Sequence, residues 1–289
     1  MSEEGGRLVV VATPIGNLGD LSPRARETLA SADLIACEDT RHSRVLLTAA
    51  NIRARRLVAL HAHNEAARTE ELMKRLLGGE VVALICDAGT PLVSDPGSRL
   101  VAAAVGAGVP VSSVPGPSAL LAALVVSGFD LTRFHFEGFL PRKGEERRAR
   151  LVAMARADEP WVVYESPKRV ASSLEELAAI CGAERRVLVA RELTKRFEEL
   201  WRGGLAAAAE WAASKPARGE YVLVVDAAEA GPAEPEDLRG ALARLLDAGL
   251  SRRDAVLAAE ILLGAAHRDA YAASLDAMGA EGSPGRPVR

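Results

Sequence analysis

The chain has 289 residues and a formal net charge of −3, with 49% hydrophobic and 26% charged residues. This length and composition are typical of a soluble protein with a large core, and they predict two domains or one large domain with an appendage. The slightly acidic balance excludes a uniformly basic nucleic-acid-binding protein, so any basic surface must be local.

The cysteines and the apolar runs bear on the cellular compartment. The three cysteines are far apart, and this odd number without metal-ligand spacing predicts reduced, buried thiols. No apolar run approaches ~20 residues, and the N-terminus lacks the pattern of a signal peptide. We therefore expect a cytoplasmic protein that does not span a membrane.

Residues 7 to about 127 alternate short apolar runs with helix-like runs. Five of these apolar runs are bounded by turn-forming residues, as buried strands of a parallel sheet are. The alternation predicts an α/β domain over residues 1–127. The expected strands are at 7–12, 33–37, 57–60, 81–85 and 110–114.

Three of the expected strands end in turns rich in proline, glycine and hydroxyl side chains, at 13–20, 86–97 and 115–119. Ligands of parallel α/β sheets bind at the carboxyl ends of strands, so three such turns favour a binding site. The alternative for the second turn is an ordinary loop, with Asp95 as N-cap and Pro96 at the first helical position. The first turn fits neither G-x-G-x-x-G nor a P-loop, which argues against dinucleotide binding.

A pair of histidines, His61 and His63, follows the third expected strand. Their spacing places them on one strand face, where they would be able to bind a metal ion. No third ligand accompanies them in a recognisable register, so we expect no metal and interpret them as polar residues lining a cleft.

Residues 128–230 repeat the alternation and predict a second α/β domain, whose cleft with the first would hold a cofactor. The strands are expected near 134–140, 161–164, 186–190 and 219–225. A linker-like segment at 231–236 leads to a helical module at 235–280, followed by a tail at 281–289 that we expect to be disordered. The module resembles a helix-turn-helix, whose second helix would begin with Arg252 and Arg253; a packing appendage is the alternative.

A basic stretch lies in the second half of the chain. Residues 133–156 contain seven basic and three acidic side chains, a local net charge of +4. Such a stretch is either a solvated helix face or a surface for RNA phosphates. Arg142 and Lys143 follow a proline turn at a strand end, which favours a position facing the cleft.

Four of the segments together resemble a known family: TPIGNLGD at 13–20, EDTR at 38–41, DAGTPLVSDPG at 87–97 and PGPSA at 115–119. They are similar to the tetrapyrrole methylase superfamily and, within it, to the ribosomal RNA small subunit methyltransferase I family. The resemblance covers residues 7 to about 226. It implies two α/β domains of the tetrapyrrole-methylase type with the cofactor cleft between them, plus the small C-terminal helical module.

The resemblance also implies an activity. That branch uses S-adenosyl-L-methionine to methylate the 2′-hydroxyl of a cytidine in small-subunit ribosomal RNA. The expected partners are this RNA or the 30S subunit, and a second copy of the chain in a homodimer. The cofactor-binding residues carried over by motif are Pro14, Gly89, Thr90, Val93, Ser118, Ala119 and Glu165.

Catalysis would need alignment of the reactants and help with the hydroxyl proton. The candidates, chosen by their position at strand ends, are Glu165, Glu192 and Lys195, and each carboxylate is either a base or the holder of a cation. Candidate RNA contacts are Arg142, Lys143, Arg147, Arg148, Lys168, Arg169 and Arg191. The family more often has His at the position of Lys168, so no proton-transfer role is assigned there.

Two alternatives to this function remain. One is a methylase of corrin or porphyrin precursors, although such relatives usually carry Asp at the position of Asn17 and lack the basic stretch at 142–150. The other is an RNA-binding module without enzymatic activity on an inert α/β scaffold.

Overall fold

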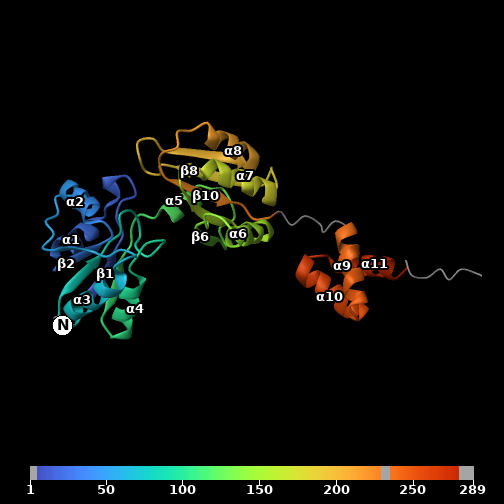
Figure 1. Cartoon of the computed structure of the whole chain (residues 1–289), viewed down its shortest axis with the longest axis horizontal. Coiled ribbons are helices and arrows are strands. Elements are labelled where there is room, and N and C mark those ends of the chain that lie inside the picture. Colours follow the sequence, from blue (N-terminus) through green and yellow to red (C-terminus); the bar gives the residue numbers. More distant parts are fainter. Residues whose placement is uncertain (1–4, 229–234, 280–289) are drawn as a thin grey trace, which may run out of the picture. The chain divides into compact units, whose positions relative to one another are not determined.

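The structure is a computed structural model that describes residues 5–228 and 235–279 (Figure 1). Residues 1–227 and 228–289 form two compact units, which are described separately below. In the described residues, no helix combines the length and the apolar character needed to cross a bilayer.

The first sheet contains five parallel strands, as the sequence predicts, and their order is β3-β2-β4-β1-β5. Two apolar layers cover its faces, one including α1 and α2 and the other including α3 and α4. Because all the strands run the same way, their carboxyl ends open on one edge. The elements are β1 Arg7–Val11, α1 Pro23–Ser31, β2 Leu34–Cys37, α2 Thr40–Ala49, β3 Leu57–Ala59, α3 Glu65–Leu77, β4 Val81–Leu84, α4 Ser98–Gly106 and β5 Val111–Val114.

The start of α4 differs from the ordinary-loop alternative, which placed the N-cap at Asp95. The helix begins at Ser98, and its N-cap residue Gly97 has no side chain to accept a hydrogen bond. Glu65 from α3 supplies that acceptor, because its Oε1 accepts from the N–H groups of Gly97 (3.0 Å) and Arg99 (3.1 Å). Asp95 is therefore not needed as a cap and remains part of the loop at the strand edge.

The second sheet is mixed, with strand order β6-β7-β10-β8-β9. Strand β6 is parallel to β7, whereas β10 is antiparallel to both β7 and β8, and β9 is antiparallel to β8. Since β7 and β8 share a direction, their last residues Glu165 and Arg191 lie on one edge, where both pair with Tyr221. The strands are β6 His135–Phe139, β7 Trp161–Glu165, β8 Arg186–Arg191, β9 Glu199–Gly204 and β10 Tyr221–Val225, of which β9 was not predicted.

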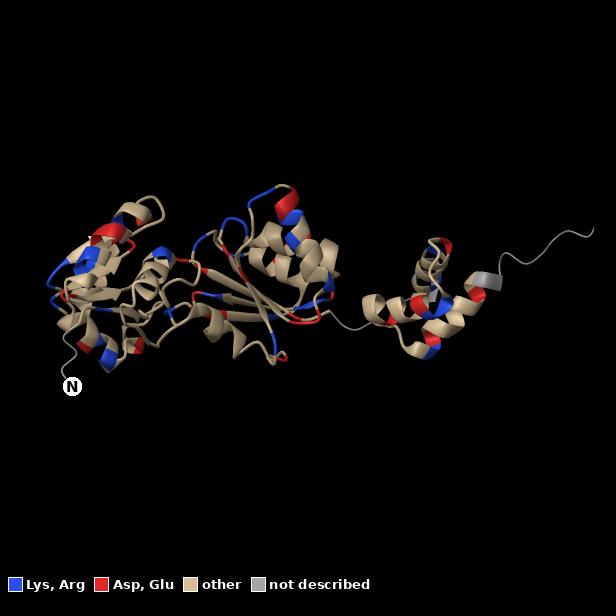
Figure 2. Ribbon diagram, turned by 90° about the horizontal axis from the view of Figure 1, so that it is seen from below, with Lys and Arg blue, Asp and Glu red and all other residues tan. Residues whose placement is uncertain are grey.

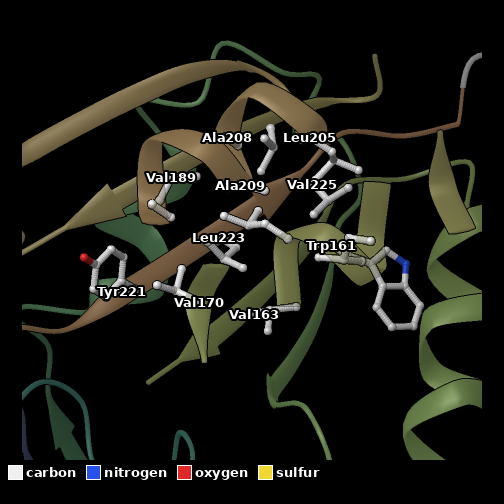
Figure 3. Close-up of a cluster of buried hydrophobic side chains, with 14 of the residues drawn as sticks. Trp161, Val163, Val170, Val189, Leu205, Ala208, Ala209, Tyr221, Leu223 and Val225 are labelled. Carbon is white, nitrogen blue, oxygen red and sulfur yellow. The ribbon is translucent and has the colours of Figure 1, made fainter. Parts of the chain in front are cut away.

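The two faces of the second sheet are covered by helices from different parts of the chain. Helices α6 Glu145–Arg156, α7 Val170–Cys181 and α8 Leu205–Ala213 pack on one face, around Val163, Val189 and Leu223 (Figure 3). The other face receives α5 Ala119–Leu124, which follows β5 of the first sheet. Helix α5 thus connects the two sheets, and its core residues Ala123 and Leu124 are almost completely buried.

The C-terminal unit contains three helices, α9 Pro235–Asp247, α10 Arg252–Leu263 and α11 His267–Gly279. They share a small core that includes Leu242, Val256 and Ala270. The predicted cap of α10 is present: the Ser251 hydroxyl accepts from the Asp254 N–H (3.2 Å) and donates to the Asp254 carboxylate (2.6 Å). Residues 231–234 of the predicted linker and the predicted tail at 281–289 lie outside the described residues, and α9 already begins at Pro235.

Candidate functional site

The three predicted turns meet at the carboxyl edge of the first sheet and are hydrogen-bonded to one another. Thr13 and Gly89 pair through their backbones, at 2.8 and 3.0 Å. The Thr90 hydroxyl donates to the Pro117 carbonyl at 3.0 Å. The turns at 13–20, 86–97 and 115–119 therefore form one connected surface, here called the cradle.

A cavity of about 400 Å³ lies between the cradle and the edge of the second sheet where β6 and β7 end and β10 begins. Six of the predicted cofactor residues line it, and Pro14 does not, although its neighbour Ile15 does. The second sheet contributes Phe139, Tyr164 and Tyr221, none of which was predicted. The predicted residues that line the cavity are Gly89, Thr90, Val93, Ser118, Ala119 and Glu165.

The loop at 86–97 has an unusual backbone. Gly89 has a φ of +88°, and a Cβ there would lie 3.2 Å from Ile15 Cγ2 and 3.7 Å from the Pro117 oxygen. Leu92 (φ 75°) and Ser94 (φ 70°) also adopt left-handed conformations, which are strained for residues with side chains. Strain that surrounding structure maintains is often found at ligand sites, and here it shapes a cavity wall.

Tyr164 fixes α5 against the second sheet. Its hydroxyl oxygen accepts a hydrogen bond from the Leu120 N–H at 3.2 Å, in the first turn of α5. Burial raises the pKa of this hydroxyl to about 12, so it remains protonated at neutral pH. Sequence reasoning identified Tyr164 only as a strand residue, because nothing local to it indicates a partner 44 positions away.

The cavity wall contributed by the cradle is acidic. Asp87 and Asp95 both line the cavity, and burial raises the pKa of Asp95, with the nearby Asp87 carboxylate adding to the shift. Burial also raises the pKa of Glu38, and the nearby carboxylates of Asp87 and Asp95 add to this rise. A cationic ligand would relieve the repulsion among these carboxylates.

Glu165 is buried and fully engaged at the floor of the cavity. Its Oε2 accepts from Arg169 (2.8 Å) and from the Ser173 hydroxyl (2.7 Å). Its Oε1 accepts from the Ser166 N–H at 2.7 Å. These partners satisfy both oxygens of the carboxyl group and hold it in place, as burial of a polar group requires.

The other two catalytic candidates form one ionic cluster with Glu220, a residue of the cavity wall. Lys195 Nζ lies 2.8 Å from both Glu192 Oε1 and Glu220 Oε2. Burial opposes the charged form of each group, but the hydrogen bonds prevail: the pKa of Lys195 is raised and that of Glu192 is lowered. Lys195 therefore carries its charge at neutral pH and is not a base.

The predicted RNA contacts divide into exposed and buried groups. Arg142, Lys143, Arg148 and Lys168 are exposed, and basic and acidic residues are interspersed over the ribbon (Figure 2). Arg147 and Arg191, by contrast, are only 6% and 7% exposed and donate to Glu176 and Glu199, respectively, while Arg169 is half-buried and held by Glu165. Arg147 and Arg191 therefore have hydrogen-bond partners within the protein, and their assignment as RNA contacts stays a prediction.

No group of three or more His, Cys, Asp or Glu side chains is arranged for metal binding within the described ranges 5–228 and 235–279. His61 and His63 contact each other edge to face, at 6.1 Å between ring centroids.

Comparison with known proteins identifies the family of this chain. The family model of tetrapyrrole (corrin/porphyrin) methylases matches residues 7–209. The chain is 48% identical over 232 residues to ribosomal RNA small subunit methyltransferase I of Mesorhizobium japonicum, covering 80% of this chain and 79% of that protein. It is 44% identical over 253 residues to the protein of the same name from Synechocystis, covering 86% and 90%. The chain belongs to the ribosomal RNA small subunit methyltransferase I family.

Solved structures agree with the fold of this methyltransferase family. The methyltransferase CobJ matches 78% of this chain and 95% of its own length, with a TM-score of 0.58 and 24% identity. Uroporphyrin-III C-methyl transferase from Thermus thermophilus, solved in complex with S-adenosyl homocysteine, matches 76% and 97%, with a TM-score of 0.55 and 21% identity. The chain is an S-adenosylmethionine-dependent methyltransferase with the two-sheet architecture of the tetrapyrrole methylases.

Substitution of Gly89 by Ala should weaken cofactor binding. The added Cβ enters the contact with Ile15 and strains a left-handed residue in the cavity wall. We expect affinity for S-adenosylhomocysteine to fall at least about tenfold by calorimetry. Gly79→Ala is the matched control, because Gly79 also has a positive φ (+94°) but has nothing within 4 Å of its Cβ position. Equal affinity in the two variants would contradict a cofactor role for the cradle.

Proposed function

We propose that the chain transfers a methyl group from S-adenosylmethionine to the 2′-hydroxyl of a cytidine in small-subunit ribosomal RNA. The observation that carries this proposal is the 42–48% identity to curated methyltransferase I proteins over most of both chains. Solved porphyrin and corrin methylases share the fold at 24% identity or less, which gives no support for their substrates here.

The cavity fits the cofactor by its chemistry. S-adenosylmethionine carries its methyl group on a positively charged sulfonium. The rest of the cofactor is the leaving group when the methyl group is transferred. Asp87 and Asp95 offer negative charge to such a cation, and Ile15, Val93 and Phe139 offer apolar surface to an adenosine. The cavity volume of about 400 Å³ lies in the range of small-molecule sites.

Glu165 and Glu192 act as positioning carboxylates in this proposal and not as bases. Glu165 already accepts three hydrogen bonds, one of them from Arg169. Glu192 holds Lys195 and also accepts from the Glu220 N–H at 3.0 Å. The charged Lys195 is then the group that stabilises negative charge developing on the ribose oxygen, next to the cavity wall at Glu220, while the hydroxyl proton passes to solvent water.

We also propose a homodimer formed through α5. Leu121 of this helix and its C-cap residue Val125 lie one turn apart and are 52% and 72% exposed. An apolar pair on a rigid helix that joins both sheets suits a self-complementary contact around a two-fold axis. The Arg202 guanidinium donates to the Val126 carbonyl and keeps the end of α5 in place.

Methylation mapping tests the reaction. Small-subunit RNA and assembled small subunits, both from cells lacking this modification, are incubated with the protein and isotopically labelled S-adenosylmethionine. Mass spectrometry of the digested RNA should find the label on the ribose of one cytidine. Label on a base, or no label on either substrate although the cofactor binds, would contradict the proposal.

Replacement of Glu192 by Gln distinguishes a positioning role from a base. Loss of its charge frees Lys195, so single-turnover methylation should slow by about 10²-fold and RNA affinity should change as well. Because the pKa of Glu192 is lowered and that of Lys195 raised, neither group titrates between about pH 6 and 9. The rate of the native chain should therefore show no titration step from either group in this range.

The control for this variant is Glu175→Gln, at an exposed position of α7, which should leave the rate unchanged. If the native rate shows a pH-dependent step that the Glu192→Gln variant lacks, and RNA affinity is unchanged, Glu192 would instead be the base.

Substitution of Val125 by Asp tests the dimer. A charge in the centre of the apolar contact should convert the dimer to a monomer in sedimentation equilibrium. Val105→Asp is the control, since Val105 is 63% exposed on α4. A native chain that sediments as a monomer, or a Val125→Asp variant that remains dimeric, would refute this contact.

A further inference from the structure

A second hollow, of about 560 Å³, lies against α6 and α7 and shares no residue with the cofactor cavity. Its rim carries the cations Arg142, Lys143 and Arg148, from the loop before α6 and its first turns. Its apolar lining includes Val152 of α6 and Ile180 of α7. The hollow therefore combines positive charge with an apolar surface.

The three cations are available to a ligand. Arg142, Lys143 and Arg148 are exposed, and no hydrogen bond or ion pair holds their side chains in the part of the chain that the structure describes. Among the residues that the structure describes, one carboxylate lines the hollow: Glu176, which accepts from Arg147 Nε at 2.8 Å, so its charge is already matched. Glu145 and Glu146, in the first turn of α6, do not line it. The hollow is thus positive overall and suited to an anion.

The apolar part distinguishes this hollow from a simple basic surface. Ile180 is 39% exposed, and it lies in the hollow with the half-buried Val152. A phosphate alone gains nothing from such side chains, whereas a nucleotide places the face of its base on apolar surface and its phosphates near cations. The volume is also within the range of sites for small ligands.

The hollow lies close to the cofactor cavity along the chain. Phe139 lines the cavity and Arg142 lines the hollow, so their Cα atoms are at most about 11 Å apart. Arg147 holds the loop between them, because its Nη1 donates to the Pro141 carbonyl at 3.0 Å. Its Nη2 donates to the Ser173 hydroxyl at 3.0 Å, which in turn donates to Glu165 of the cavity at 2.7 Å.

We propose that this hollow binds a nucleotide of the ribosomal RNA strand that flanks the nucleotide being methylated. This inference rests on the proposed function, since it takes the RNA as substrate. The short separation matches a few nucleotides of single strand, whose rise when stacked is about 3.4 Å each. The cations contact phosphates, Val152 and Ile180 contact a base, and the loop at 139–142 sets the spacing to the reactive ribose.

The test measures equilibrium binding of a fluorescent small-subunit RNA fragment directly, in the presence of S-adenosylhomocysteine. The double variant Arg142→Ala/Arg148→Ala should weaken binding at least about tenfold and lower the log–log salt slope by roughly 0.7 for each phosphate that the protein no longer neutralises. Ile180→Ser should weaken binding about fivefold without changing the slope, because it removes apolar surface only. Arg156→Ala, at an exposed position in the last turn of α6, is the control and should bind normally.

Cofactor affinity and the melting temperature of each variant, measured in parallel, show that the fold and the cavity are intact. Unchanged RNA affinity and salt slope in the double variant would overturn the proposal. The proposal would also be overturned if the double variant lowers the salt slope but Ile180→Ser leaves RNA affinity unchanged. The hollow would then be only a general basic surface. Because RNA binding is read without methyl transfer, these outcomes are separate from failure of the methylation assay.

Discussion

The site depends on the attachment of α5 to the second sheet. This helix continues directly from the PGPSA turn of the cradle, yet it buries Ala123 and Leu124 on the other sheet. The hydrogen bond from the Leu120 N–H to the Tyr164 hydroxyl fixes its first turn, beside Ser118 and Ala119 of the cavity. One short helix thereby sets the distance between the two strand edges that enclose the cavity.

Buried charge is the second constraint on the site. A carboxylate as deeply buried as Glu165 is tolerated only with close partners, and Arg169, Ser173 and the Ser166 N–H provide them. Ser173 also accepts from Arg147, so the same chain of hydrogen bonds holds the loop that carries Arg142 and Lys143. The cavity and the loop before α6 therefore have a common support in the second sheet.

The local patterns predicted the first sheet well, because buried parallel strands are continuous apolar runs and their ends carry distinctive turns. The same patterns missed features that depend on distant partners. The start of α4 required Glu65, 32 positions before Gly97, and Tyr164 acquired its role only through Leu120. A charge run cannot show which of its members is buried, so Arg147 was grouped with its exposed neighbour Arg148. Strand β9 was missed because two of its six residues are glycines and two are charged.

Hydrogen–deuterium exchange with and without S-adenosylhomocysteine tests whether both sheets enclose the cofactor. If they do, binding slows exchange both in the cradle segments at 87–95 and 117–120 and in the second-sheet segments at 164–167 and 219–222. Protection confined to the cradle, with the second-sheet segments unchanged, would contradict it.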